Sequence, residues 1–130
     1  MQIPNAGIVG IGVDIVDITR IAKLQDEKKV ALSKKILSEK ELEACGYTVT
    51  SQILASRFAA KEAVSKALGT GFRSISFVDI SILHNNLGKP FVDLGDKALL
   101  LAKSKGITEL YVSISHEKNT AIAFCIATGE

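Results

Sequence analysis

The chain has 130 residues, a length that fits one domain with its own hydrophobic core, so we expect a single domain over residues 1–130. Hydrophobic residues make up 47% of the sequence and charged residues 23%, which is ordinary for a globular protein and excludes a disordered chain. The net charge of +2 is too small, and the lysines are too scattered, to indicate nucleic-acid binding.

The cysteines and the apolar segments bear on where the protein works. Cys45 and Cys125 are far apart in the sequence, and the first residues lack the basic and apolar segments of a secretory leader. No apolar run approaches the roughly 18 residues that cross a membrane. We therefore expect free thiols, no membrane attachment and a cytoplasmic location.

Residues 8–17 are rich in β-branched side chains and predict the first strand. Gly10, Gly12 and Asp14 alternate onto one face of it, which predicts bare backbone beside a carboxylate, as close approach of a metal or a phosphate ester requires. Asp14 is therefore a candidate ligand. Asp17 directly precedes apolar residues at helical spacing and is expected to cap a helix over residues 18–24.

Short helical pieces are predicted between residues 25 and 46. Ser38 and Glu41 have the spacing of a capping box, which places a helix start at Ser38, and Gly46 is a plausible end for that helix. Charged residues dominate this region, Glu41 among them, and are expected to form a solvated face.

The longest helix is predicted over residues 51–68, ending at Gly69 and Gly71. On a helical wheel its apolar arc is mostly alanine and consists of Ala59, Ala60, Ala63, Val64, Ala67 and Leu68. The polar arc consists of Lys61, Glu62, Ser65 and Lys66. Phe58 falls on the polar arc close to Glu62, which indicates a pocket wall or a subunit contact; the alternative is an ordinary surface helix with a Glu62–Lys66 ion pair.

After residue 71 the apolar pattern changes to the period of two that is typical of strands. Strands are predicted over residues 74–83 and 91–94, and a hairpin over residues 109–115 and 120–127. A helix over residues 95–105 is expected to bury Ala98, Leu99, Leu101 and Ala102 and to end at Gly106. This order predicts an α+β fold in which helices pack on one side of an antiparallel sheet.

Asp14 and Glu62 are the two carboxylates on faces that suit a ligand. Two such oxygen donors, completed by water and a substrate phosphate, are typical of a magnesium site. Lys66, one helical turn after Glu62, is placed to meet negative charge on a phosphate, and His116 at a strand end is a candidate phosphate donor or proton acceptor. Spacing alone does not bring residues 14, 62 and 116 together, and a lone histidine at a turn is more often simply exposed.

Four segments occur in one order: Gly10-Ile11-Gly12-Val13-Asp14 followed by Arg20, Arg57 to Gly71, Gly88-Lys89-Pro90, and Ser113-Ile114-Ser115-His116. Together they closely resemble the holo-acyl-carrier-protein synthases, the small 4′-phosphopantetheinyl transferases, over about residues 8 to 127. The resemblance implies a 4′-phosphopantetheinyl transferase-like α+β fold and a homotrimer that binds coenzyme A between neighbouring subunits. It also implies transfer of the phosphopantetheine arm of coenzyme A to a serine of an apo acyl carrier protein, with release of adenosine 3′,5′-bisphosphate.

The resemblance also assigns roles to residues. It implies that Asp14 and Glu62 hold a magnesium ion on the pyrophosphate of coenzyme A, and that Lys66 contacts the phosphates and steadies the leaving group. The attacking serine comes from the carrier protein. As acceptor of its proton we favour Glu62 or a metal-bound water over His116.

The remaining ligand contacts follow from the same resemblance. Arg57 and His116 would hold the region of the 3′-phosphate, and Gly88, Lys89 and Pro90 would line the adenine pocket, mainly through their backbone.

The sequence departs from the family where the carrier protein docks. Several arginines often occupy the first helix of these enzymes, whereas here Arg20 alone stands at a matching place, and Asp26 and Glu27 would repel an acidic partner. Arg20 is therefore a candidate carrier contact or a structural ion-pair partner, and whether the carrier serves fatty-acid synthesis or another pathway stays open. Two alternatives remain: a non-enzymatic homo-oligomer that binds coenzyme A or the carrier, and a magnesium-dependent phosphohydrolase.

Overall fold

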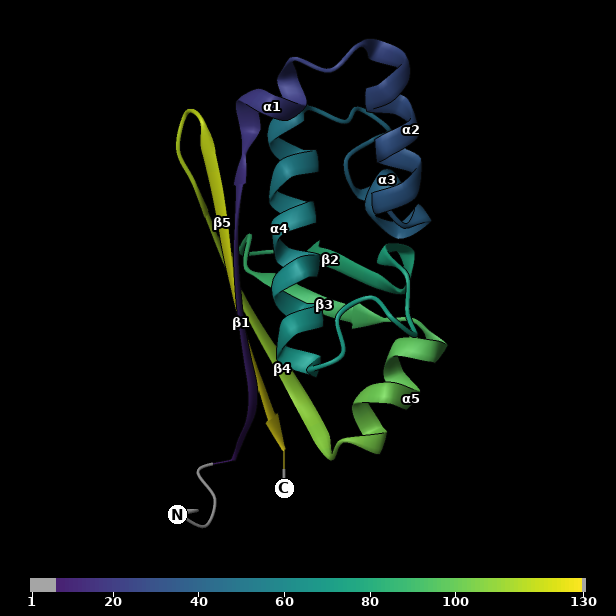
Figure 1. The fold of residues 1–130 in the computed structure, drawn as a ribbon, viewed down its shortest axis with the longest axis vertical. Coiled ribbons are helices and arrows are strands. Elements are labelled where there is room, and N and C mark those ends of the chain that lie inside the picture. Colours follow the sequence, from purple (N-terminus) through teal and green to yellow (C-terminus); the bar gives the residue numbers. More distant parts are fainter. Residues whose placement is uncertain (1–6, 130) are drawn as a thin grey trace.

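A long helix, α4 (Ser51–Leu68), runs through the middle of the molecule, with the other elements placed around it (Figure 1). The structure is a computed structural model and describes residues 7–129. In chain order the other elements are β1 (Ile8–Asp17), α1 (Ile18–Ala22), α2 (Asp26–Ile36), α3 (Glu39–Ala44), the 3₁₀ turn η1 (Phe77–Asp79), β2 (Ile80–His84), β3 (Pro90–Leu94), α5 (Asp96–Ser104), β4 (Ile107–His116) and β5 (Thr120–Gly129).

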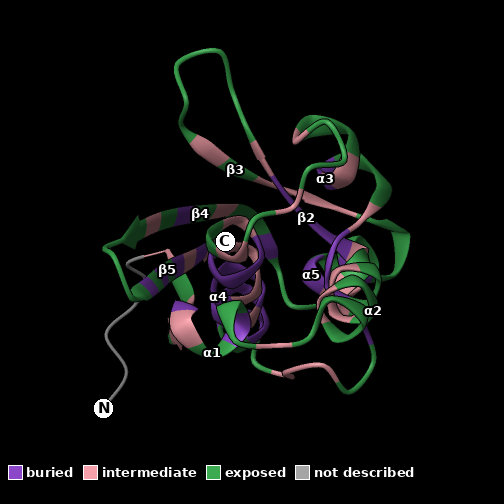
Figure 2. Cartoon of the chain, turned by 90° about the horizontal axis from the view of Figure 1, so that it is seen from above, coloured by how far each residue is buried: buried purple, intermediate pink, exposed green. Residues whose placement is uncertain are grey.

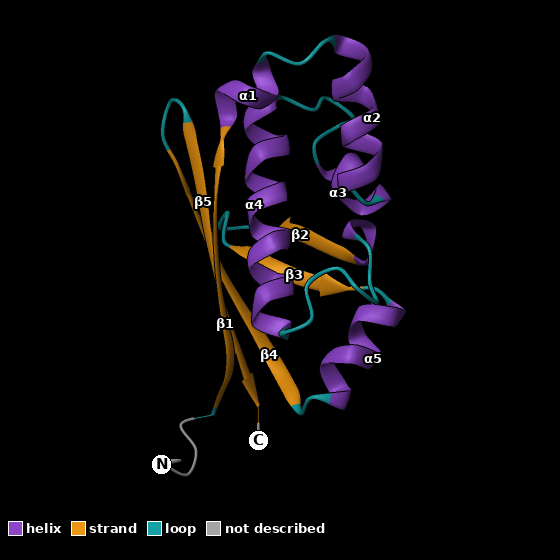
Figure 3. Ribbon diagram, viewed as in Figure 1, coloured by secondary structure: helices purple, strands orange, loops and turns teal. Residues whose placement is uncertain are grey.

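Three long strands form an antiparallel sheet in the order β1-β5-β4, and β2 and β3 form a separate antiparallel hairpin. Figure 3 shows all the helices on the same side of the three-stranded sheet, with α4 directly against it. The α+β fold with helices on one face of an antiparallel sheet is thus confirmed.

The glycine face of β1 is covered by α4. A Cβ at Gly10 would lie 1.9 Å from the carbonyl oxygen of Ala67, and one at Gly12 would lie 1.8 Å from that of Ala63. The expectation that these glycines leave bare backbone for a ligand is therefore wrong. They instead let the strand and the alanine face of α4 approach each other more closely than any side chain would permit.

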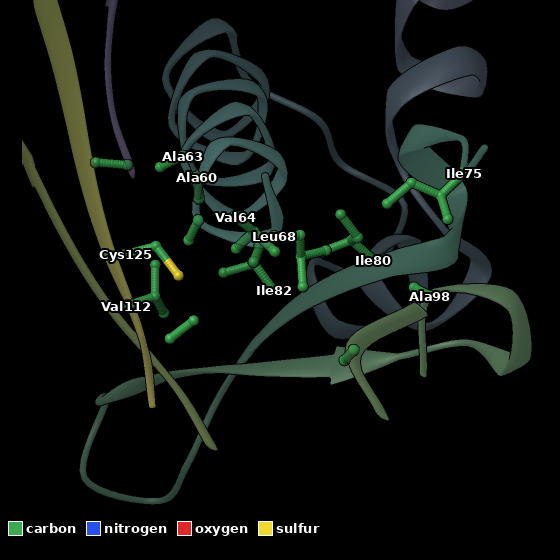
Figure 4. Packing of buried hydrophobic residues seen from close by; sticks show 14 of the residues in the cluster. Ala60, Ala63, Val64, Leu68, Ile75, Ile80, Ile82, Ala98, Val112 and Cys125 are labelled. Carbon is green, nitrogen blue, oxygen red and sulfur yellow. The ribbon is translucent and has the colours of Figure 1, made fainter. Parts of the chain in front are cut away.

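The core lies on both sides of α4, which is buried along most of its length (Figure 2). Close up, Val64 and Leu68 lie between Cys125 and Val112 of the sheet and Ile80 and Ile82 of β2 (Figure 4). A second cluster joins α1, α2 and the first half of α4 through Ile18, Ile21, Ile36, Leu37, Leu54 and Ala55. Because α4 has neighbours on both sides, its buried surface is much wider than the apolar arc of its sequence.

Lys61 shows this difference most clearly. The sequence places it on the polar arc, but its side chain is fully buried and pairs with the equally buried Glu41 of α3. Ser65 is also buried and donates to the carbonyl oxygen of Glu62. The predictions of a solvated Lys61 and a solvated Glu41 are therefore wrong.

The ends of the helices follow the predicted capping residues. Asp17 accepts a hydrogen bond from the backbone N–H of Thr19 at 2.9 Å and caps α1. Ser38 and Glu41 form the capping box of α3, and Gly69 ends α4 with a φ of 86°.

Two predictions in the second half of the chain need correction. The strand predicted over residues 74–83 begins only at Ile80, because residues 76–79 form a turn in which Asp79 accepts a hydrogen bond from the backbone N–H of Ser76. Leu99, expected in the core, is 41% exposed. Among residues 7–129, no helix combines the length and apolar character needed to span a membrane.

Candidate active site

A cleft of about 540 Å³ opens where the end of β1 meets α1, α2 and α4. Its polar wall carries Asp14 and Asp17 of the strand, Arg20 of α1 and Glu62 of α4. Its apolar wall includes Ile15, Ile21, Leu24, Leu32 and Phe58. The predicted carboxylates therefore meet in one concave site, with an apolar surface beside them.

Asp14 and Glu62 interact through their charges. The pKa of Glu62 is raised, first by partial burial and then by the neighbouring charge of Asp14, while Lys66 acts in the opposite direction. Lys66 donates from Nζ to the carbonyl oxygen of Val13 at 2.9 Å and lies 3.4 Å from Oδ1 of Asp14. The structure thus brings Asp14 next to Glu62 and Lys66, which spacing alone could not do.

This acidic pair fits a hard divalent cation. Within residues 7–129 there is no group of three or more histidine, cysteine, aspartate or glutamate side chains that could hold a metal by themselves. Magnesium retains several waters and binds proteins through one or two carboxylates together with substrate phosphates. Asp14 and Glu62 match that donor set.

Phe58 forms part of the cleft wall, as its position beside Glu62 predicts. Its ring stacks on Phe77 with 5.4 Å between centroids, and Phe77 stacks on Phe72 at 4.0 Å. The apolar side of the cleft is therefore continuous with the packing of η1.

Arg57 lies elsewhere on α4, in a pocket of about 160 Å³ that also contains Glu41, Cys45 and His84. Burial lowers the pKa of the Arg57 guanidinium, while Glu41 and Cys45 raise it. The pKa of His84 is lowered by partial burial and by the positive charge of Arg57. Arg57 is thus separated from the acidic cleft within one chain.

His116 ends β4 and is exposed. The side-chain nitrogen of Gln52, at the start of α4, lies 2.9 Å from Nε2 of His116. His116 lines neither the acidic cleft nor the Arg57 pocket.

The turn that carries Gly88, Lys89 and Pro90 joins β2 to β3 and projects from the rest of the chain (Figure 2). Oδ1 of Asn85 accepts hydrogen bonds from the backbone N–H groups of Leu87 at 2.9 Å and Lys89 at 3.0 Å. Gly88 has a φ of 82°, a left-handed conformation that favours glycine. This turn also lies outside the acidic cleft.

Several site residues escape sequence reasoning. Leu24 and Leu32 line the cleft, and only the helical spacing of Leu24 gives a local signal for it. Glu41 and His84 adjoin Arg57 although they come from α3 and β2, and no local pattern connects them. Arg20, the candidate carrier contact, is placed on the wall of the cleft.

Comparison with known proteins gives a consistent family. Residues 10–125 match the family model of the 4′-phosphopantetheinyl transferase superfamily. A Clostridium perfringens protein named holo-[acyl-carrier-protein] synthase is 44% identical over 128 residues, which cover 95% of this chain and 96% of that protein.

Solved structures show the same relation. A holo-[acyl-carrier-protein] synthase from Neisseria meningitidis is 40% identical, with a TM-score of 0.85, over 92% of this chain and 98% of that one. The Helicobacter pylori synthase, solved in complex with coenzyme A, is 35% identical, with a TM-score of 0.78, over 91% of this chain and 99% of that one.

Proposed function

Because the chain belongs to the 4′-phosphopantetheinyl transferase superfamily, we propose that it transfers the 4′-phosphopantetheine group of coenzyme A to a serine of an apo acyl carrier protein. It is then a holo-acyl-carrier-protein synthase, and adenosine 3′,5′-bisphosphate is the second product. The observation that carries the proposal is the meeting of Asp14 and Glu62 at one cleft, with Lys66 in contact with Asp14; two of the four segments that resemble the family contribute these residues.

Asp14 and Glu62 would hold the magnesium ion that the reaction requires. When bound, this ion neutralises charge on the pyrophosphate of coenzyme A. Lys66 already lies within reach of Asp14 and supplies a cation for the phosphate oxygens of the leaving group.

The chain itself needs no nucleophile, since the attacking serine belongs to the carrier protein. The enzyme's task is to align that hydroxyl with the phosphorus next to the pantetheine and to accept its proton. Our proposed acceptor is Glu62 or a metal-bound water, because both would lie at the acidic cleft, whereas His116 lies outside it.

We assign the other contacts to a neighbouring subunit of a homotrimer. Arg57, His116 and the Gly88-Lys89-Pro90 turn lie outside the acidic cleft of their own chain, which favours a site that a neighbouring subunit completes. A site between two subunits joins the acidic cleft of one chain to the Arg57 side of the next.

The uncovered face of the three-stranded sheet supports this assembly. Large apolar side chains are exposed along it: Val9, Ile11, Val13, Ile15, Tyr111, Ile122 and Phe124. An apolar face of this extent is typical of a protein interface. The trimer therefore buries the side of the sheet that the helices leave open.

Arg20 is our proposed contact for the acidic surface of the carrier protein, because it lies at the wall of the cleft where the serine must enter. Asp26 and Glu27 open α2 nearby and restrict which acidic surface fits. We place the reaction in the cytoplasm, in keeping with two cysteines that are not joined to each other.

The test is the intact mass of an apo acyl carrier protein after incubation with this protein, coenzyme A and magnesium. We expect a gain of one phosphopantetheine group, abolished by a chelator and by Glu62→Gln. Asp96→Asn, the same change of a carboxylate to an amide at an exposed site on α5, is the matched control and should leave the transfer unchanged.

Coenzyme A binding without any mass gain on several carriers would contradict the transfer and indicate a non-enzymatic binding protein. Release of phosphate from coenzyme A without a carrier would indicate a hydrolase.

A further inference from the structure

A buried ion pair connects α4 to the elements on its far side. Lys61 and Glu41 have side chains that are 0% and 2% exposed, and Nζ of Lys61 lies 2.5 Å from Oε1 of Glu41. Nζ also donates to the carbonyl oxygens of Ile36 and, at 3.0 Å, Phe77. All three N–H groups of the ammonium thus have acceptors.

The carboxylate of Glu41 extends the connection. Its Oε1 accepts a hydrogen bond from the backbone N–H of Ser38 at 3.0 Å, and its Oε2 accepts one from that of Ile82 at 3.1 Å. The pair therefore ties α4 to the end of α2, the start of α3, η1 and β2.

The role of this ion pair lies in the positions of the segments that it hydrogen-bonds rather than in a gain in folding stability. Removing two charges from water costs about as much free energy as their attraction returns, and apolar residues of similar size are often equally stabilising. What apolar residues cannot do is fix the backbone of four segments by directed hydrogen bonds. The pair therefore sets where β2 and α3 lie relative to α4.

The segments held in this way adjoin two of the candidate coenzyme A contacts that lie away from the acidic cleft, Arg57 and the turn with Gly88, Lys89 and Pro90. Glu41 and Arg57 line the same small pocket, and β2 leads directly into the turn with Gly88, Lys89 and Pro90. By contrast, Asp14, Glu62 and Lys66 meet on the β1 side of α4.

We propose that Lys61 and Glu41 are positioning residues for coenzyme A, which hold the β2–β3 hairpin, with its Gly88-Lys89-Pro90 turn, at a fixed distance and angle from α4 and from Arg57 on that helix. The inference rests on the proposed function. Loss of the pair weakens binding of the nucleotide end of coenzyme A, whereas the carrier protein and the metal, which meet the other side of α4, bind as before.

The experiment compares Lys61→Met with Val64→Ala, a core substitution on the same helix that leaves the polar network intact. The readouts are the KM for coenzyme A, the KM for the carrier, the magnesium concentration for half-maximal rate, and the calorimetric Kd of adenosine 3′,5′-bisphosphate. Hydrogen exchange of the β2 amides reports the hairpin directly. If Lys61→Met fails to fold, the double variant Lys61→Met/Glu41→Leu takes its place in the comparison, because it removes both charges and leaves no unpaired buried charge.

For Lys61→Met we expect a rise of about tenfold in the KM for coenzyme A and in the Kd of the bisphosphate, with carrier KM and magnesium dependence within about twofold. The amide of Ile82 should exchange faster in this variant than in Val64→Ala. An equal rise in both KM values, or equal effects in Val64→Ala, would overturn the positioning role. A wild-type protein that transfers nothing would instead overturn the proposed function, and the exchange of the β2 amides would still decide whether the pair holds the hairpin.

Discussion

Single residues of α4 differ in their electrostatic surroundings according to which neighbour they face. Glu62 faces Asp14, so its charged form is penalised by burial and by a like charge. Arg57 faces Glu41 and His84. The carboxylate of Glu41 favours the positive charge of Arg57, and that charge in turn disfavours protonation of His84. Lys61 faces inward and has no contact with solvent.

The titration of His84 tests the Arg57 pocket. Its pKa lies below the ordinary 6.5 because of partial burial and the charge of Arg57. Arg57→Gln should therefore raise the pKa of His84 part of the way toward 6.5, as measured from the imidazole shifts in NMR, whereas Arg73→Gln, at an exposed site, should not change it.

The sign of the accompanying stability effect follows from linkage. The unfolded chain binds this proton at a higher pH than the folded chain does, so the contribution of His84 to stability is complete above pH 6.5. It is lost as the pH falls through the lower, folded-state pKa. An unchanged His84 pKa in Arg57→Gln would place the two side chains in separate environments.

At the scale of elements, the packing of β1 against α4 positions the acidic cleft. Two glycines on the strand face alanines on the helix, and this small-residue contact sets how far Asp14 lies from Glu62. Any added atom at the contact has to move the strand, the helix or both.

Gly12→Ala should therefore destabilise the protein by about 2 kcal/mol or more, because its Cβ would overlap a backbone oxygen that cannot move aside alone. Gly95→Ala is the control, since its Cβ would lie 3.3 Å from the nearest atom, the carbonyl oxygen of Asp79. Urea denaturation followed by circular dichroism measures both. Similar midpoints for the two variants would contradict the close contact of β1 with α4.

The sequence predicted the elements whose signals are local. The strand β1, the helix α4 and the β4–β5 hairpin follow from apolar periodicity, and Asp17 and Ser38 follow from capping chemistry. The prediction of a strand in the segment before β2 was wrong, because alternating polar and apolar side chains occur in a turn as well as in a strand.

The site was harder to predict because its geometry is tertiary. Glycines on one face of a strand give the same sequence pattern whether a ligand or a helix covers that face. The helical-wheel pattern of α4 gave no reason to bury Lys61, because its partner Glu41 comes from another helix. The strand and helix faces marked Asp14 and Glu62 as candidate ligands, but only the family resemblance joined them in one site. The position of Arg57 beside His84 had no signal at all.

At the scale of the whole molecule, the sheet has two unlike faces. Helices cover one face (Figure 3). The other face exposes apolar side chains, of which Ile15 is 67% exposed. Water in contact with such a surface favours association, and a closed symmetric assembly buries it without leaving a new edge.

Phe124→Glu should therefore dissociate the proposed homotrimer. Phe124 lies on the central strand of the uncovered face, where a carboxylate cannot be buried without a partner. Light scattering should report a monomer with an unchanged circular dichroism spectrum. Leu100→Glu makes the same change at an exposed leucine of α5 and should leave the mass of the assembly unchanged.

Mixing two inactive variants tests whether each site is shared between subunits. Glu62→Gln removes the acidic side of a site and Arg57→Ala the opposite side, so each pure assembly should be inactive. After mixing and reassembly, about one quarter of the sites in a trimer should combine an intact Glu62 from one subunit with an intact Arg57 from the next. Transfer to the carrier protein should therefore recover to about one quarter of the wild-type rate per subunit. If every site lay within one chain, no mixture would recover activity, because each chain would still lack one of the two residues.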